Sequence, residues 1–126
     1  MITEDYVSFE VAKLLKEKGF DENTEHKMWY VIKQFSTGCQ WNSCTHKVGD
    51  ITREYNDDCC IPMPTHQMAM KWLREVYDIK IMIRPYVDGT YSYEILNGFW
   101  YVNFDSYEDA TDDALKYCLE NLNKLI

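Results

Sequence analysis

Three segments of the chain repeat apolar residues at the spacing of an amphipathic helix, and a good helix-capping residue precedes each one. Ser8 precedes the first segment, which ends at Gly19. Thr65 precedes the second, which ends near Asp78, and Ser106 precedes the third, which runs to the last residues. Serine and threonine at this position accept a hydrogen bond from a backbone N–H of the first turn. The pattern therefore predicts three helices, each packed by one face.

Runs of β-branched and aromatic residues predict a strand over residues 28–35 and three further strands within residues 79–104. The pair Asn97-Gly98 favours a two-residue type I′ turn between the last two strands. A turn of that length would place six side chains together on the core face of the sheet: Tyr91, Tyr93, Ile95, Trp100, Val102 and Phe104.

The turn at Asp88-Gly89 requires a different length. A two-residue loop there would put the preceding isoleucine row on the face opposite Tyr93. Because a shift of one residue moves every side chain of a strand to the other face, an odd-length loop or a bulge restores agreement. We therefore expect one of these, and Pro85 marks a suitable place for a bulge.

Residues 36–64 show no sustained period, with weak strand signals at 40–41 and 48–55. A segment of this length without structure is uncommon in a compact domain, so a short hairpin or a bound metal would account for it. The whole pattern predicts one α+β domain over residues 1–126. Its order is helix, strand, loop, helix, three-stranded antiparallel meander and helix, with the last two helices packed on one face of the meander.

The second face of the meander has two interpretations. The predicted register turns four side chains away from the two helices: Met82, Leu96, Phe99 and Tyr101. If the N-terminal helix and strand cover them, the domain has a three-layer core. If they stay exposed, they form an apolar patch of the kind that binds a partner protein.

The charge balance limits the possible partners. The chain carries 13 Lys and Arg against 21 Asp and Glu, a net charge of -8. Nucleic-acid affinity comes largely from basic residues that release counterions, so we do not expect nucleic-acid binding. Acids at the start of the last helix, Glu108, Asp109, Asp112 and Asp113, are favoured there by the helix dipole and predict a solvated face. Imitation of a phosphate backbone, as in an inhibitor of nucleic-acid binding, is an alternative.

Four of the five cysteines lie between residues 39 and 60. A zinc site would take Cys39, Cys44, His46 and either Cys59 or Cys60. The Cys-x2-Cys spacing typical of zinc knuckles is missing, so we expect thiols and no cofactor, with zinc as the alternative. An odd number of cysteines also fits thiols in a reducing compartment.

No sequence motif predicts a catalytic site. A cysteine nucleophile with His46 or His66 as its base would need a geometry that the spacing does not establish, so we do not expect an enzyme. No stretch approaches the roughly 18 apolar residues of a membrane span, and the first residues include two acids rather than basic ones. We therefore expect a cytoplasmic protein that does not cross a membrane.

Residues 65–126 resemble a double-stranded RNA-binding domain in the order of their elements, helix, three strands and helix. That family grips phosphates with a lysine-rich motif at the start of its last helix. Here the matching position reads SYEDATDD, so the resemblance implies a topology and no RNA binding.

The whole chain resembles small uncharacterised proteins of phages, prophages and mobile elements of gut Bacteroidetes. The segments that carry this resemblance are YVSFEVAKLLKEKGFDE (6–22), PTHQMAMKWLREVYDIKI (64–81) and SYEDATDDALKYCLENL (106–122). The resemblance implies a phage or mobile-element setting in a bacterial host cell and no particular chemistry. With the acidic charge and the aromatic content, it predicts a non-enzymatic accessory protein that binds a protein partner or associates with itself. The alternatives are a zinc-stabilised recognition module using residues 39–60 and the acidic mimic.

Overall fold

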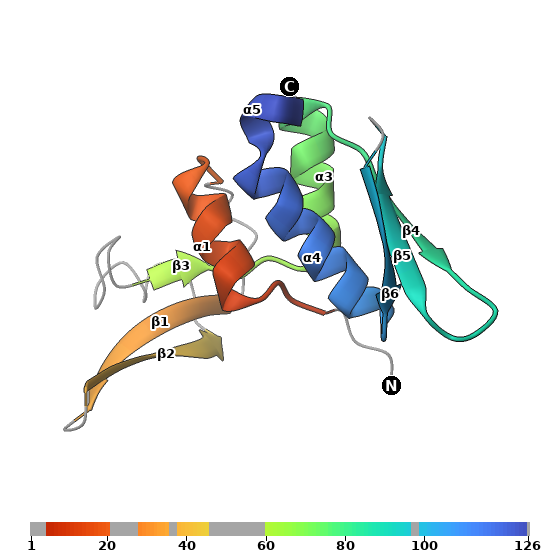
Figure 1. Cartoon of the computed structure of the whole chain (residues 1–126). Helices are drawn as coiled ribbons and strands as arrows, with labels where there is room; N and C mark the ends of the chain where they lie inside the picture. Colours follow the sequence, from red (N-terminus) through yellow and green to blue (C-terminus); the bar gives the residue numbers. More distant parts are fainter. Residues whose placement is uncertain (1–4, 21–27, 36–37, 46–59, 97–98, 126) are drawn as a thin grey trace. The chain divides into compact units, whose positions relative to one another are not determined.

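The computed structural model describes residues 5–20, 28–35, 38–45, 60–96 and 99–125. These residues belong to two compact units (Figure 1). One comprises residues 8–64, and the other comprises residues 1–7 with 65–126. That the units together act as one domain stays a prediction of the sequence. The fold is of the predicted α+β class.

The unit of residues 8–64 contains helix α1 (Phe9–Glu17) and strands β1 (Met28–Phe35), β2 (Gly38–Thr45) and β3 (Cys60–Pro62). Ser8 caps α1 as predicted, because its hydroxyl accepts from the N–H of Val11 at 3.3 Å. At the other end Gly19 has a φ of +96°, and the N–H of Phe20 donates to the carbonyl of Leu15 at 2.9 Å. This is the Schellman motif that a glycine at this place favours.

The segment expected to be irregular is partly strand. β2 pairs antiparallel with β1 along its whole length, from Met28↔Thr45 to Phe35↔Gly38, and β3 pairs with the other edge of β1. The sheet order is β2-β1-β3. A hairpin therefore organises the first part of the segment, as one of the two expectations allowed. The strand signal at 48–55 lies outside the described residues.

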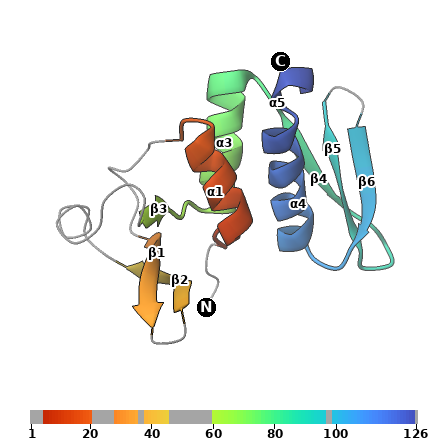
Figure 2. The ribbon, with the colours of Figure 1, turned by 60° about the vertical axis from the view of Figure 1, so that its left-hand side comes forward.

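The second unit contains helix α3 (His66–Tyr77), strands β4 (Ile81–Pro85), β5 (Tyr91–Ile95) and β6 (Phe99–Phe104), and helices α4 (Tyr107–Glu120) and α5 (Leu122–Leu125). The strands form an antiparallel sheet of order β4-β5-β6. Helix α4 lies along one face of this sheet, and α3 packs beside α4 (Figure 2). None of the described helices is long and apolar enough to span a membrane.

The core of this unit lies between α4, α3 and the sheet. Its largest fully buried side chains include Leu73, Tyr93, Ile95, Leu115 and Leu119. The odd-length connection predicted between the first two strands of the meander is confirmed. Five residues, 86–90, join β4 to β5, so the isoleucines at 81 and 83 pair with Ile95 and Tyr93 on the core face.

The predicted register of the last hairpin is wrong. β5 and β6 pair as Ile95↔Phe99 and Tyr93↔Tyr101, so three residues connect them instead of two. Because side chains alternate along a strand, this one-residue change reverses the expected faces. Tyr101 joins Tyr93 on the helix-covered face, while Trp100 and Val102 lie on the opposite face with 64% and 39% of their surface exposed.

A β-bulge returns the end of β6 to the predicted alignment. The register shifts between Tyr91 and Tyr93, so that Tyr91 pairs with Phe104, as expected. Asn103 next to Phe104 takes a left-handed φ of +71°, a conformation that asparagine tolerates better than most residues. The rings of Tyr93 and Phe104 are 5.5 Å apart. The bulge thus lies in the second hairpin and not near Pro85.

Candidate functional site

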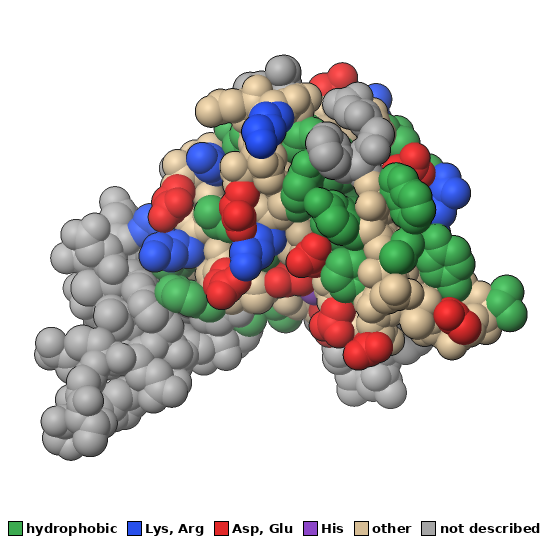
Figure 3. Space-filling model, in the orientation of Figure 1, with side chains coloured by type: hydrophobic (Ala, Val, Ile, Leu, Met, Phe, Trp, Pro, Cys, Tyr) green, Lys and Arg blue, Asp and Glu red, His purple; other side chains and the backbone are tan. Residues whose placement is uncertain are grey.

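The face of the β4–β6 sheet opposite α4, called here the outer face, is the candidate site. The strand register places Met82, Arg84, Glu94, Trp100 and Val102 on it, because Met82 pairs with Glu94 and Glu94 pairs with Trp100. Met82 is 41% exposed. Trp100 and Val102 are also exposed, so the elements of this unit leave the outer face uncovered. Figure 3 shows hydrophobic side chains gathered over the sheet.

An ion pair lies among these apolar side chains. The guanidinium Nη2 of Arg84 is 3.0 Å from the carboxylate Oε2 of Glu94, and Arg84 Nε is 3.3 Å from the sulfur of Met82. More than half of the Arg84 side chain is exposed, so the pair contributes little to stability, at most about 1 kcal/mol. Its larger consequence is for the local net charge, because the opposite charges of Arg84 and Glu94 cancel.

An open pocket of about 270 Å³ adjoins Trp100. It is lined by Arg84, Tyr86, Ser92, Tyr93, Glu94 and Trp100. Pockets that enclose cofactors and other small molecules measure about 300–1,000 Å³ and bury most of the ligand. This one is smaller and open to solvent, and it has room for a single side chain of a partner. The pocket is therefore a hollow of the surface and not an enclosed cavity.

The four residues predicted to form a partner surface do not share one face. Met82 and Leu96 are exposed, with Leu96 at 47%. Tyr101 is 45% exposed but lies on the helix-covered side, where its ring is 5.4 Å from that of Tyr93. The side chain of Phe99 lies outside the described residues. Trp100 was not predicted at the surface, because a two-residue turn at Asn97-Gly98 places it on the core face. A three-residue turn at the same place would place it on the outer face.

The residues of the predicted zinc site are only partly described. Cys39 and Cys44 both lie in β2, and five residues of extended chain separate their Cα atoms by about 17 Å. Two cysteines that share one zinc ion need Cα atoms within roughly 10 Å, given a Zn–S bond of about 2.3 Å. Strand β2 would have to break for both to bind one ion. His46 and Cys59 lie outside the described residues.

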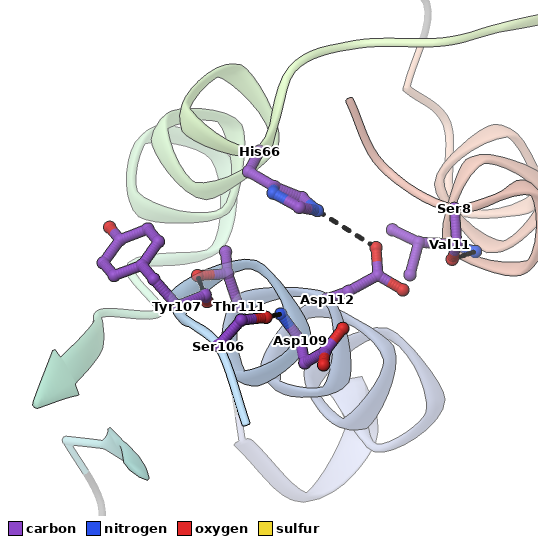
Figure 4. Close-up of polar contacts among 8 residues, drawn as sticks. All are labelled: Ser8, Val11, His66, Ser106, Tyr107, Asp109, Thr111 and Asp112. Carbon is purple, nitrogen blue, oxygen red and sulfur yellow. Dashed lines mark hydrogen bonds and ion pairs between the residues drawn. The ribbon is translucent and has the colours of Figure 1, made fainter. Parts of the chain in front are cut away.

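Two of the acids at the start of α4 contact groups within the unit: Asp112 is partly buried, while Asp113 stays exposed as the predicted solvated face requires. In Figure 4 the carboxylate of Asp112 points toward the ring of His66, and its Oδ1 is 3.2 Å from Nε2. Asp113 accepts a 2.9 Å hydrogen bond from the hydroxyl of Tyr93. His66 is buried in the first turn of α3, directly after the capping residue Thr65. Of the four carboxylates of the mimic hypothesis, Asp112 and Asp113 therefore each have a contact within the unit.

The contact between His66 and Asp112 should be measurable as a coupling between α3 and α4. We expect His66→Ala and Asp112→Ala each to lower the free energy of unfolding, and the double variant to lose about 1 kcal/mol less than the sum of the two. Urea unfolding of the four proteins at neutral pH measures this difference. Additive losses would show that the two side chains stabilise the fold independently.

Burial raises the pKa of titratable side chains in the second unit. Cys118 is fully buried in α4, and burial raises the pKa of its thiol to about 12, so the nucleophilic thiolate is scarce near neutral pH. Burial, together with the hydrogen bond to Asp113, likewise raises the pKa of Tyr93. Within the described ranges, no three His, Cys, Asp or Glu side chains are grouped so that they could hold a metal ion.

Comparison with protein-family models, with curated proteins and with solved structures finds no match to this chain. Evidence for its function therefore comes from its own residues. Among those described, the outer face combines an exposed tryptophan with an adjoining pocket.

Proposed function

We propose that this protein is a non-enzymatic accessory protein of a phage or mobile element, which acts in the cytoplasm of the host by binding a protein through the outer face. The setting rests on the resemblance of three sequence segments to proteins of that origin. The mode of action rests on one observation, the exposure of 64% of Trp100 on the outer face beside a pocket the size of one side chain.

The free energy of apolar burial supports this use of the face. Burying a tryptophan removes about 150–250 Å² from water, at about 25 cal/mol per Å². Tryptophan is also among the residues that contribute most to protein interfaces when a partner covers them. Met82 and Val102, both partly exposed, extend the apolar area around it. A protein surface that covered these three side chains would be held by the free energy of removing their apolar area from water.

A photo-crosslinking amino acid placed at Val102 tests this function inside producing cells. We expect position 102 to crosslink to protein, and the yield to fall at least fivefold when Trp100→Ala is added. The matched control position is Val76, a valine on α3 that is 55% exposed and lies off the sheet. Equal yields at 76 and 102, or a yield at 102 that ignores Trp100, would contradict the proposed function.

A further inference from the structure

We propose that the occupant of the outer face is a second copy of this chain, packed face to face about a two-fold axis. The inference rests on the proposed function, because it names the partner of the same surface. A two-fold interface brings one surface against itself, so the surface must be complementary to its own copy in charge and in shape.

The charges of the outer face meet this requirement. The chain as a whole carries a net charge of -8, which opposes association of two copies. Next to Trp100 on the outer face the charged side chains are Arg84 and Glu94, one of each sign and 3.0 Å apart. Lys80, opposite Leu96 at the end of the sheet, pairs with Asp78 at 3.4 Å. Turning a second copy by 180° can set Arg84 opposite Glu94 of that copy, and Glu94 opposite its Arg84. The face is therefore a place where two acidic chains can meet without like charges in contact.

The shape of the outer face also allows it to be complementary to its own copy. A two-fold arrangement needs a projecting group and a hollow on the same surface, since each copy supplies both. Trp100 is the most exposed aromatic side chain among the described residues, and the pocket of about 270 Å³ lies next to it. The pocket has room for one side chain of the second copy, so that the projecting and hollow parts of the two faces can be filled together.

The size of the face sets the expected affinity. Three strands about 4.8 Å apart and five to six residues long span about 14 Å by 17–20 Å. Stable complexes bury about 800 Å² of accessible surface on each partner, and this face offers less than that. We therefore expect a weak dimer, with a dissociation constant on the order of 10–100 µM, that exchanges readily with the monomer.

Sedimentation equilibrium of the full chain from about 5 to 500 µM tests this. We expect a monomer–dimer equilibrium that strengthens when salt is raised from about 0.05 to 0.5 M, because salt screens the repulsion between two acidic chains. Trp100→Ala should weaken the dimer at least tenfold, and Val76→Ala should leave it unchanged. Circular dichroism of each variant confirms that it is folded.

A charge-swap pair makes the test specific for the two-fold contact. Arg84→Glu and Glu94→Arg each break the pair within a chain and set like charges against each other between copies, so each alone should weaken dimerisation. In an equimolar mixture, the glutamates of one variant face the arginines of the other, and association should recover. Recovery in the mixture cannot come from the pair within one chain, since that pair stays broken in both proteins.

Several results would overturn the inference. A chain that stays monomeric at 500 µM would show that it does not self-associate. A dimer whose affinity does not change with Trp100→Ala, or a mixture of the charge variants that does not recover association, would show that the dimer does not form through this face. If position 102 still crosslinks to a different protein in cells, the proposed function stands and only the identity of the occupant fails. If position 102 crosslinks to nothing, both fail.

Discussion

Replacing Tyr93 by alanine should lower the free energy of unfolding by about 3–5 kcal/mol, the usual cost of removing a buried aromatic ring. The side chain is 1% exposed, and its ring lies 5.4 Å from that of Tyr101 and 5.5 Å from that of Phe104. Its hydroxyl donates to Asp113, so the substitution also removes a link between β5 and α4. Urea unfolding followed by circular dichroism measures the loss.

Two control variants separate the contributions to that loss. Tyr101→Ala removes the same side chain from the neighbouring strand on the same face, where it is 45% exposed, and should cost less than half as much. Tyr93→Phe keeps the ring and removes only the hydrogen bond to the carboxylate, at a cost of about 1–2 kcal/mol. If Tyr93→Ala cost no more than Tyr101→Ala, the assignment of Tyr93 to the centre of the core would be wrong.

Between pH 9 and pH 11 the chain should lose about 2–3 kcal/mol of stability through Cys118 alone. The ordinary pKa of a thiol is taken as 9.0, and burial raises that of Cys118 to about 12 in the folded state. Above pH 9 the unfolded chain therefore releases this proton while the folded chain keeps it. The unfolded state then binds fewer protons, so stability falls as pH rises, by about 1.4 kcal/mol per pH unit. Below pH 9 both states hold the proton and the effect vanishes.

Cys118→Ala isolates this dependence from that of the other titrating groups. The variant should be slightly less stable than the parent chain at pH 8, because the small side chain leaves a cavity. It should lose stability more slowly with pH, so that the two curves converge or cross by pH 11. Urea unfolding in reducing buffer at pH 8, 9, 10 and 11 measures both. Parallel curves would show that the thiol titrates alike in the folded and unfolded chains.

The sequence determined the features that depend on neighbouring residues along the chain. Ser8, Thr65 and Ser106 cap their helices as predicted, since each hydroxyl accepts from an N–H three residues later. These bonds form within one turn and need no distant partner. The odd number of residues between β4 and β5 was also predictable, because the isoleucines of β4 and the apolar residues of β5 had to lie on the same face of the sheet.

The tertiary structure decided the features that depend on contacts between distant elements. Asn97-Gly98 indicates a turn but leaves open whether two or three residues form it. In the fold, Tyr101 pairs with Tyr93 and its ring lies 5.7 Å from that of Tyr117 on α4, while the bulge brings Phe104 to the same face. Packing against α4 thus sets the register, and the register exposes Trp100.

The partners of the acids on α4 were decided in the same way. The helix dipole favours acids in the first turns whether or not they meet another group, so local sequence could not tell a solvated carboxylate from an engaged one. Asp112 and Asp113 meet His66 and Tyr93 because α3 and β5 pack against α4. The sequence determined which elements form, since local bonds and periodicity suffice for that. Only the packing of those elements decided which side chains are buried together and which face remains exposed.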